Sequence, residues 1–209
     1  KPSANPFAKA IKDESQIASR NFDGEVMWLG MFGQVEYSND NLSAFAQASI
    51  SNQQFQRIDN WILDGVTVQQ GQVANKKTGF EGIWGYNAKA GVNYNIDENH
   101  NVFANAGFYS KQPNNYAVYP NNQQIVNPNL INEKISSVEL GYGYRSSKVR
   151  GNVNLYYTEW KDRFTRLGGL TMNDQAGVET RNIYANIEGV KEVHMGAEFE
   201  LFYKPLDFL

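Results

Sequence analysis

Seven stretches of this chain alternate between uncharged and polar positions with a period of two, which is the period of a β-strand. In the clearest stretch every odd position from Val193 to Tyr203 is uncharged, while Glu198 and Glu200 fall on even positions. The seven predicted strands cover residues 26–37, 42–51, 86–96, 101–109, 137–144, 149–157 and 193–203. Every charged side chain within them falls on the same one of the two faces. The pattern therefore predicts an all-β fold, an antiparallel up-and-down meander with one uncharged face.

Four of these strands place a tyrosine next to a short turn, namely Tyr37, Tyr94, Tyr144 and Tyr203. A tyrosine ring is apolar while its hydroxyl can stay in water, which favours tyrosine at a membrane boundary. Transmembrane β-barrels carry such aromatic girdles next to short periplasmic turns. We therefore expect these four residues to form a lipid-facing girdle and the chain to form a partial transmembrane β-barrel.

A soluble or surface-anchored β-sandwich that binds glycan or protein is the alternative, because its strands would also alternate. The uncharged face, however, contains many small residues that would pack poorly in a buried core: Ala44, Ala46, Ala48, Ala88, Ala90, Ala104 and Ala106. On the lipid face of a barrel, an arginine or lysine at the bilayer midplane costs about 2–4 kcal/mol. An uncharged but loosely filled face thus favours contact with lipid.

Three connections between the predicted strands are long and rich in Asn, Gln and Gly: residues 53–84, 111–134 and 164–190. Outer-membrane barrels have short periplasmic turns and long extracellular loops. Aromatic side chains on these loops and in the upper lumen could stack on a sugar, peptide or chelate ring. The candidates for ligand contact are Trp61, Tyr116, Tyr119 and Trp160. The alternative for each of them is that it simply covers the mouth of the barrel.

The charged face of the strands supplies a second set of candidates. We expect Lys89, Glu139, Arg150, Glu198 and Glu200 to face the water-filled lumen of the barrel. Catalysis has little support, because no nucleophile and base converge at one rim. The two histidines, His100 and His194, lack the spacing of metal ligands, and there is no cysteine. We therefore expect no enzymatic activity, no metal and no cofactor.

The composition argues against two further classes of protein, those that cross a membrane with helices and those that bind nucleic acid. The 209 residues carry a net charge of −3 and have a mean hydropathy of −0.55. No window reaches the ~20 continuous apolar residues of a membrane helix. A mildly acidic chain also lacks the basic patch of a nucleic-acid-binding protein, so nucleic acid is not expected as a partner.

Three passages resemble TonB-dependent outer-membrane receptors. Residues 127–130 read Asn-Pro-Asn-Leu and lead to Ser-Val-Glu-Leu-Gly-Tyr at 137–142, as in a loop-to-strand passage of that family. Residues 156–162 resemble a strand of the family that ends in Asp. Residues 196–200 and 203–205 resemble its Gly-x-Glu strand near the end of the barrel. The sequences of these passages are most similar to receptors of Bacteroidetes type. Asn129 replaces the usual Asp, however, and Ile131-Asn132 replaces the usual Lys-Pro.

The resemblance implies a 22-stranded barrel closed by an N-terminal plug, of which about seven or eight strands lie in residues 1–209. It implies import of a scarce ligand (siderophore, cobalamin, glycan or peptide) across the cell outer membrane, with energy delivered by TonB. The chain would be the C-terminal part of the barrel domain, and we expect the plug, the TonB box and the final strands to lie outside it. The implied partners are outer-membrane lipid, the protein's own plug, TonB and a nutrient.

Overall fold

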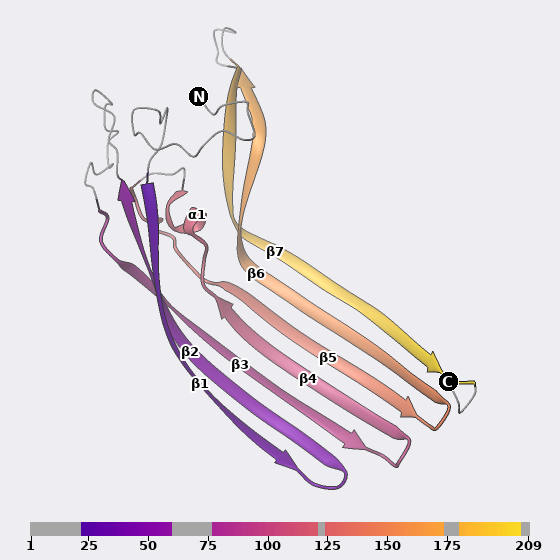
Figure 1. Ribbon diagram of the computed structural model, residues 1–209. Coiled ribbons are helices and arrows are strands. Elements are labelled where there is room, and N and C mark those ends of the chain that lie inside the picture. Colours follow the sequence, from indigo (N-terminus) through magenta and orange to yellow (C-terminus); the bar gives the residue numbers. More distant parts are fainter. Residues whose placement is uncertain (1–21, 60–76, 121–123, 174–179, 206–209) are drawn as a thin grey trace, which may run out of the picture.

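The structure is a computed structural model that describes residues 22–59, 77–120, 124–173 and 180–205. Seven antiparallel strands in one sheet make up almost all of this described part. Each strand pairs with its neighbour in the sequence, in the order β1 to β7. The strands are β1 (Phe22–Ser38), β2 (Leu42–Asp59), β3 (Glu81–Asn95), β4 (His100–Lys111), β5 (Glu133–Arg145), β6 (Val149–Asn173) and β7 (Thr180–Tyr203). One short helix, α1 (Asn115–Val118), lies between β4 and β5. The predicted meander is confirmed (Figure 1).

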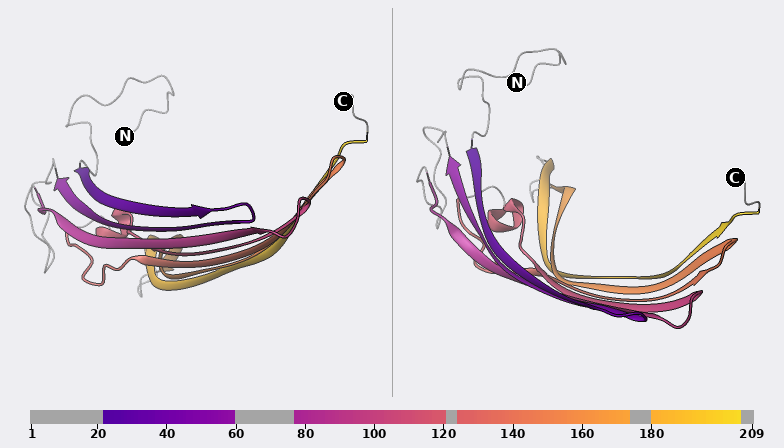
Figure 2. Two further views of the ribbon diagram at one scale, coloured as in Figure 1. Left: turned by 90° about the horizontal axis from the view of Figure 1, so that it is seen from below. Right: turned by 60° about the horizontal axis from the view of Figure 1, so that its bottom comes forward.

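The sheet is curved, and α1 lies on its concave side between the upper ends of β1–β3 and those of β6–β7 (Figure 2). A β-sandwich requires a second sheet packed face to face on the first. The described strands form a single sheet, which is the form expected for a section of a barrel wall. No helix in this described part is long and apolar enough to cross a membrane.

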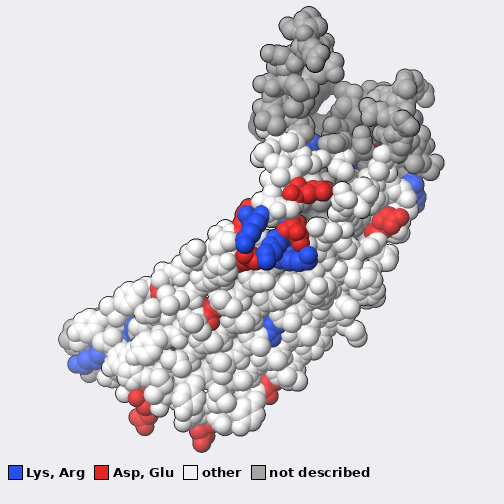
Figure 3. All heavy atoms as spheres, turned by 180° about the vertical axis from the view of Figure 1, so that it is seen from behind, with Lys and Arg blue, Asp and Glu red and all other residues white. Residues whose placement is uncertain are grey.

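The strand register places the uncharged positions of all seven strands on one face. Across the middle of the sheet, Ala104 of β4 lies opposite Leu140 of β5, which in turn lies opposite Leu155 of β6. Large apolar side chains on this face are open to solvent: Leu29 is 76% exposed and Met195 71% exposed. Figure 3 shows the convex side, where a wide area is largely free of charged side chains.

The small buried core lies on the opposite, concave face. Phe55 of β2 packs there against Val118 of α1 and Tyr119, and Ile83, Val126 and Leu130 close the cluster from the side. Phe55 has the parity opposite to that of Ala46 and Ala48, which carry the uncharged face of β2. The uncharged face is therefore the convex one, because α1 lies on the concave side.

The structure differs from the sequence prediction mainly in the length of the strands. The predicted connection 164–190 is largely strand, since β6 continues to Asn173 and β7 begins at Thr180. The register shifts between Trp160 and Arg163, and Asp162 has a left-handed backbone with φ 57°. A bulge of this kind changes which side chains face which side. The alternation on which the prediction depended is lost at that point, although the strands go on.

The sequence prediction that all charged side chains of the strands lie on one face is wrong for the parts of the strands that extend beyond the predicted stretches. That prediction holds within the seven predicted stretches. Beyond them, Lys134 lies on the same side as Val138, Glu159 and Lys161 on the same side as Tyr157, and Lys191 on the same side as Val193. The convex face thus carries charged side chains above its uncharged area.

Candidate functional site

The concave face holds the five charged residues that the sequence assigned to the lumen: Lys89, Glu139, Arg150, Glu198 and Glu200. Their side follows from the register, because Gln47 shares the parity of Phe55 on β2 and pairs with Lys89 of β3. The same register continues through Asn105 of β4 and Glu139 of β5 to the last strands. The face therefore presents charges of both signs along its width.

Amide side chains hold two of the carboxylates of this face in place. Asn105 Nδ2 donates to Glu139 Oε2 at 3.1 Å, and Asn152 Nδ2 donates to Glu200 Oε2 at 3.1 Å. The ammonium group of Lys89 lies 5.6 Å from the centre of the Phe45 ring. These contacts leave a polar wall with fixed acceptors, which suits recognition of a polar partner rather than proton-transfer chemistry.

Aromatic rings on this face lie over glycines of the neighbouring strand. Phe45 is opposite Gly91, Phe103 is opposite Gly141, and Tyr156 is opposite Gly196. A Cβ atom placed on any of these glycines would come within 2.1–2.8 Å of the facing ring. Each glycine therefore leaves room for a ring to lie flat on the sheet, an arrangement that protects the glycine backbone.

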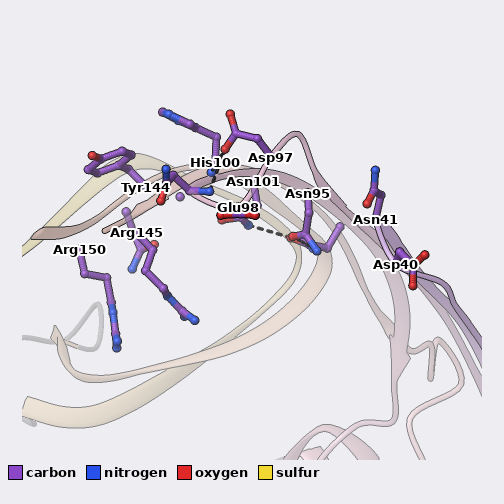
Figure 4. Close-up of a pocket in the computed structure, with 14 residues that line it drawn as sticks. Asp40, Asn41, Asn95, Asp97, Glu98, His100, Asn101, Tyr144, Arg145 and Arg150 are labelled. Carbon is purple, nitrogen blue, oxygen red and sulfur yellow. Dashed lines mark hydrogen bonds between the residues drawn. The ribbon is translucent and has the colours of Figure 1, made fainter. Parts of the chain in front are cut away.

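A polar hollow of about 540 Å³ opens near the short turns, between the ends of β3 to β6. Its lining includes Asp97 and Glu98 from the β3–β4 turn, and Arg145 and Arg150 from the β5–β6 hairpin. In Figure 4 the two arginine side chains extend to the opposite side of the sheet from the His100 ring. Asp97 Oδ1 accepts from the backbone N–H of His100 at 2.8 Å, which fixes the turn.

The sequence reasoning missed this hollow, because its lining comes from separate turns whose proximity depends on the strand register. The only sequence signal was the concentration of Asn and Asp in the turns. In the described part of the chain, no group of three or more His, Asp and Glu side chains is arranged to hold a metal ion.

The four predicted ligand-contact residues have different environments. Trp61 lies outside the described residues. Tyr119 is buried at 1% exposure, and its hydroxyl donates to the carbonyl of Phe55 at 3.3 Å and lies 3.0 Å from Thr78 Oγ1. Tyr116 in α1 is 56% exposed, with the guanidinium of Arg166 5.7 Å from its ring centre.

Trp160 does not belong to a loop, contrary to the prediction. It is part of β6, because that strand continues past the expected end. The ammonium group of Lys111 lies 5.3 Å from the centre of its ring, and the guanidinium of Arg163 lies 5.1 Å from it. The indole therefore contacts cations at the upper part of the concave wall.

The described parts of the β4–β5 connection, residues 112–120 and 124–132, extend across the concave side. On one flank Asn115 lies next to Gly24 of β1, where a Cβ would be 3.7 Å from Asn115 Oδ1. On the other flank Asn127 Nδ2 donates to Glu188 Oε1 of β7 at 2.6 Å. Tyr116 reaches Arg166 of β6 as described above. This connection therefore contacts strands at both sides of the sheet.

The four predicted girdle tyrosines lie on the convex side next to the short turns. Tyr94 pairs with Leu42 and Val102, and Tyr203 pairs with Val149. The Tyr144 ring lies 5.0 Å from the His100 ring. A second aromatic group, which the sequence reasoning missed, lies at the other edge of the same face. Its members are Trp84, Tyr86, Phe108 and Tyr157.

Comparison with known proteins gives the family. The family described as "TonB dependent receptor-like, beta-barrel" matches residues 3–208. No curated protein matches the chain. Among solved structures, the "Copper transporter OprC" is similar with a TM-score of 0.65 and 13% identity, covering 87% of this chain and 27% of that one. The "siderophore receptor PirA from Pseudomonas aeruginosa" is similar with a TM-score of 0.53 and 13% identity, covering 88% of this chain and 41% of that one.

The similarity to these two solved structures supports the fold described above, a section of a β-barrel. The chain spans less than half the length of either of these solved proteins. The family match covers nearly every residue, and it agrees with the antiparallel meander and the single uncharged face. This chain belongs to the family of TonB-dependent receptor-like β-barrels.

Proposed function

We propose that the chain is part of the wall of an outer-membrane receptor that imports a scarce ligand into the periplasm. The observation that carries this proposal is the uncharged convex face, which extends through all seven strands of a sheet curved like a section of a barrel. Aromatic side chains lie at both edges of that face, as the girdles of a membrane barrel do. A soluble protein would not leave so wide an apolar face open to water.

The same proposal implies further parts of the receptor outside residues 1–209. Residues 1–209 supply about seven of 22 strands from the C-terminal part of the barrel, and the plug, the TonB box and the final strands belong to the rest of a longer protein. A receptor of Bacteroidetes type fits the three sequence passages. The ligand would be a siderophore, cobalamin, glycan or peptide, and we assign the segment no enzymatic activity.

The concave wall is the proposed surface for the plug and for the passing ligand. Its ordered amides and carboxylates can form hydrogen bonds to a polar partner, and Lys89, Glu139, Arg150, Glu198 and Glu200 supply charge. Toward the extracellular end, the exposed Tyr116 ring is positioned for stacking on a ligand. We also assign Trp61 and Trp160 to this end of the receptor, and Tyr119 supports the loop from within.

A charge scan of the full-length receptor tests the proposal. Ala90→Arg and Ala197→Arg place a charge on the convex face, at a cost of about 2–4 kcal/mol each near the bilayer midplane. Both variants should fail to accumulate as folded barrel in the outer membrane. The measurement is the amount of receptor in outer-membrane fractions that migrates as folded barrel when the sample is not heated.

The control is Asn93→Arg, because Asn93 lies on the concave face opposite Ser43 and Phe103. This variant should assemble at close to the wild-type level. Equal assembly of all three variants would show that the convex face does not contact lipid.

A further inference from the structure

Five charged side chains form a network on the convex face, above its uncharged area. Lys134 Nζ lies 2.7 Å from Asp162 Oδ2. Glu159 lies between two lysines: its Oε1 is 2.6 Å from Lys161 Nζ, and its Oε2 is 2.5 Å from Lys191 Nζ. We call these five residues the outer charge network. Figure 3 shows positive and negative side chains gathered at one place on this side of the molecule.

The network contains more positive than negative charge. Three lysines face two carboxylates, which leaves a net charge of +1. Lys134 of β5 and Lys161 of β6 lie directly opposite each other in the register. Like charges in such a cross-strand pair are destabilising unless anions compensate them. The lysine side chains are 49%, 54% and 55% exposed, so their ammonium groups remain open to a further anion.

The distance between the network and the girdle tyrosines matches the height of the lipid-facing band of a membrane barrel. Lys191 lies twelve positions before Tyr203 on β7, and Lys134 lies ten positions before Tyr144 on β5. These separations correspond to about 40 Å and about 33 Å along the strands. With a strand tilt of ~40°, they become roughly 25–30 Å along the barrel axis, close to the ~25 Å height of a lipid-facing band. The network thus lies at the opposite edge of the band from the girdle tyrosines.

We propose that the outer charge network binds the phosphate of a lipid headgroup in the outer leaflet. This inference rests on the proposed function, which places the convex face in the membrane. Phosphate oxygens accept charge-assisted hydrogen bonds from lysine and supply the negative charge that the network lacks. A lipid fits better than a soluble anion, because the apolar side chains of Tyr157 and Val193 adjoin the network and can contact the acyl part of the same molecule.

The test uses the purified full-length receptor in detergent, with a phosphorylated glycolipid and the same glycolipid without phosphate as probes. Native mass spectrometry measures how much of each lipid remains bound. The triple variant Lys134→Gln, Lys161→Gln, Lys191→Gln should retain at least ten-fold less of the phosphorylated lipid, since each lysine near an anionic surface contributes about 1 kcal/mol, or about five-fold. Retention of the lipid without phosphate should stay unchanged. The matched control is Lys148→Gln in the short turn between β5 and β6, far from the network, and it should leave the retention of both lipids unchanged.

A second variant separates lipid binding from a purely structural ion-pair network. Glu159→Gln raises the net charge of the network from +1 to +2, so it should increase retention of the phosphorylated lipid several-fold. A network that serves only stability predicts no such gain. Unchanged retention in the triple variant, equal loss of both lipids, or release of the lipid by inorganic phosphate at comparable concentration would each overturn the proposal. Outer-membrane fractionation of the same variants reports separately on the proposed function.

Discussion

At the scale of single residues, the concave wall depends on glycines that accommodate a neighbouring ring. Gly141 and Phe103 are the tightest pair, because a Cβ on Gly141 would lie 2.1 Å from Phe103 Cε1. No side chain can occupy that space while the ring keeps its position. In the sequence these glycines occupy ordinary positions of the polar face, and the partner of each one depends on the register, which the pattern of one strand does not give.

Gly141→Ala should therefore destabilise the barrel by about 1–3 kcal/mol, the usual cost of overpacking a filled site. The urea midpoint of the refolded receptor in detergent measures this loss. Gly33→Ala is the control, since nothing lies within 4 Å of a Cβ at that position, and it should leave the midpoint nearly unchanged. Adding Phe103→Leu to Gly141→Ala should recover part of the loss. Equal midpoints for the two alanine variants would contradict this account.

At the scale of elements, the strand cores were predictable while their upper ends were not. Alternation identified all seven strands, because each middle section has one face in a different environment from the other. It failed where β6 passes the bulge around Asp162, since the two faces exchange there. It also gave no sign of α1, whose four residues are too few to show a helical period. Tyr116 and Tyr119 looked equivalent for the same reason, although one is exposed and the other buried.

The two tyrosines of this loop should respond differently to substitution. Tyr119→Ala removes a buried ring and the hydrogen bond to the Phe55 carbonyl, at a cost of about 3–5 kcal/mol to local packing. The β4–β5 connection should then become a site of cleavage when intact cells are treated with protease. Tyr116→Ala should leave cleavage at the wild-type level, because that ring is largely exposed. Similar cleavage of both variants would show that the buried cluster does not hold the loop.

At the scale of the whole molecule, the sheet has two edge strands. Among the described strands, β1 pairs only with β2, and β7 pairs only with β6. Long unpaired edges next to an apolar face are sites where chains add to one another. The fold class and the two faces were predictable because they depend on periodicity. The closure that we propose for the barrel was not predictable in this way, because the described sheet has two open edges.

Residues 1–209 produced alone should therefore associate through these edges. In detergent, sedimentation should show species far larger than the 23.6 kDa chain, while the full-length receptor should remain monomeric. The unpaired backbone groups of β1 and β7 are the physical reason, since a second copy can satisfy them. A single sharp species at the mass of one chain would show that the edges are protected within this segment.

The β4–β5 connection has a mechanical consequence for the molecule as a whole. It contacts β1 and β2 on one flank and β6 and β7 on the other, so it joins two parts of the wall that the sheet itself connects only through the intervening strands. A connection that spans the concave side and contacts both ends of the sheet limits how far the sheet can flatten or curl. In the proposed receptor, the width of the pore in this sector therefore depends on these contacts as well as on the number of strands around it.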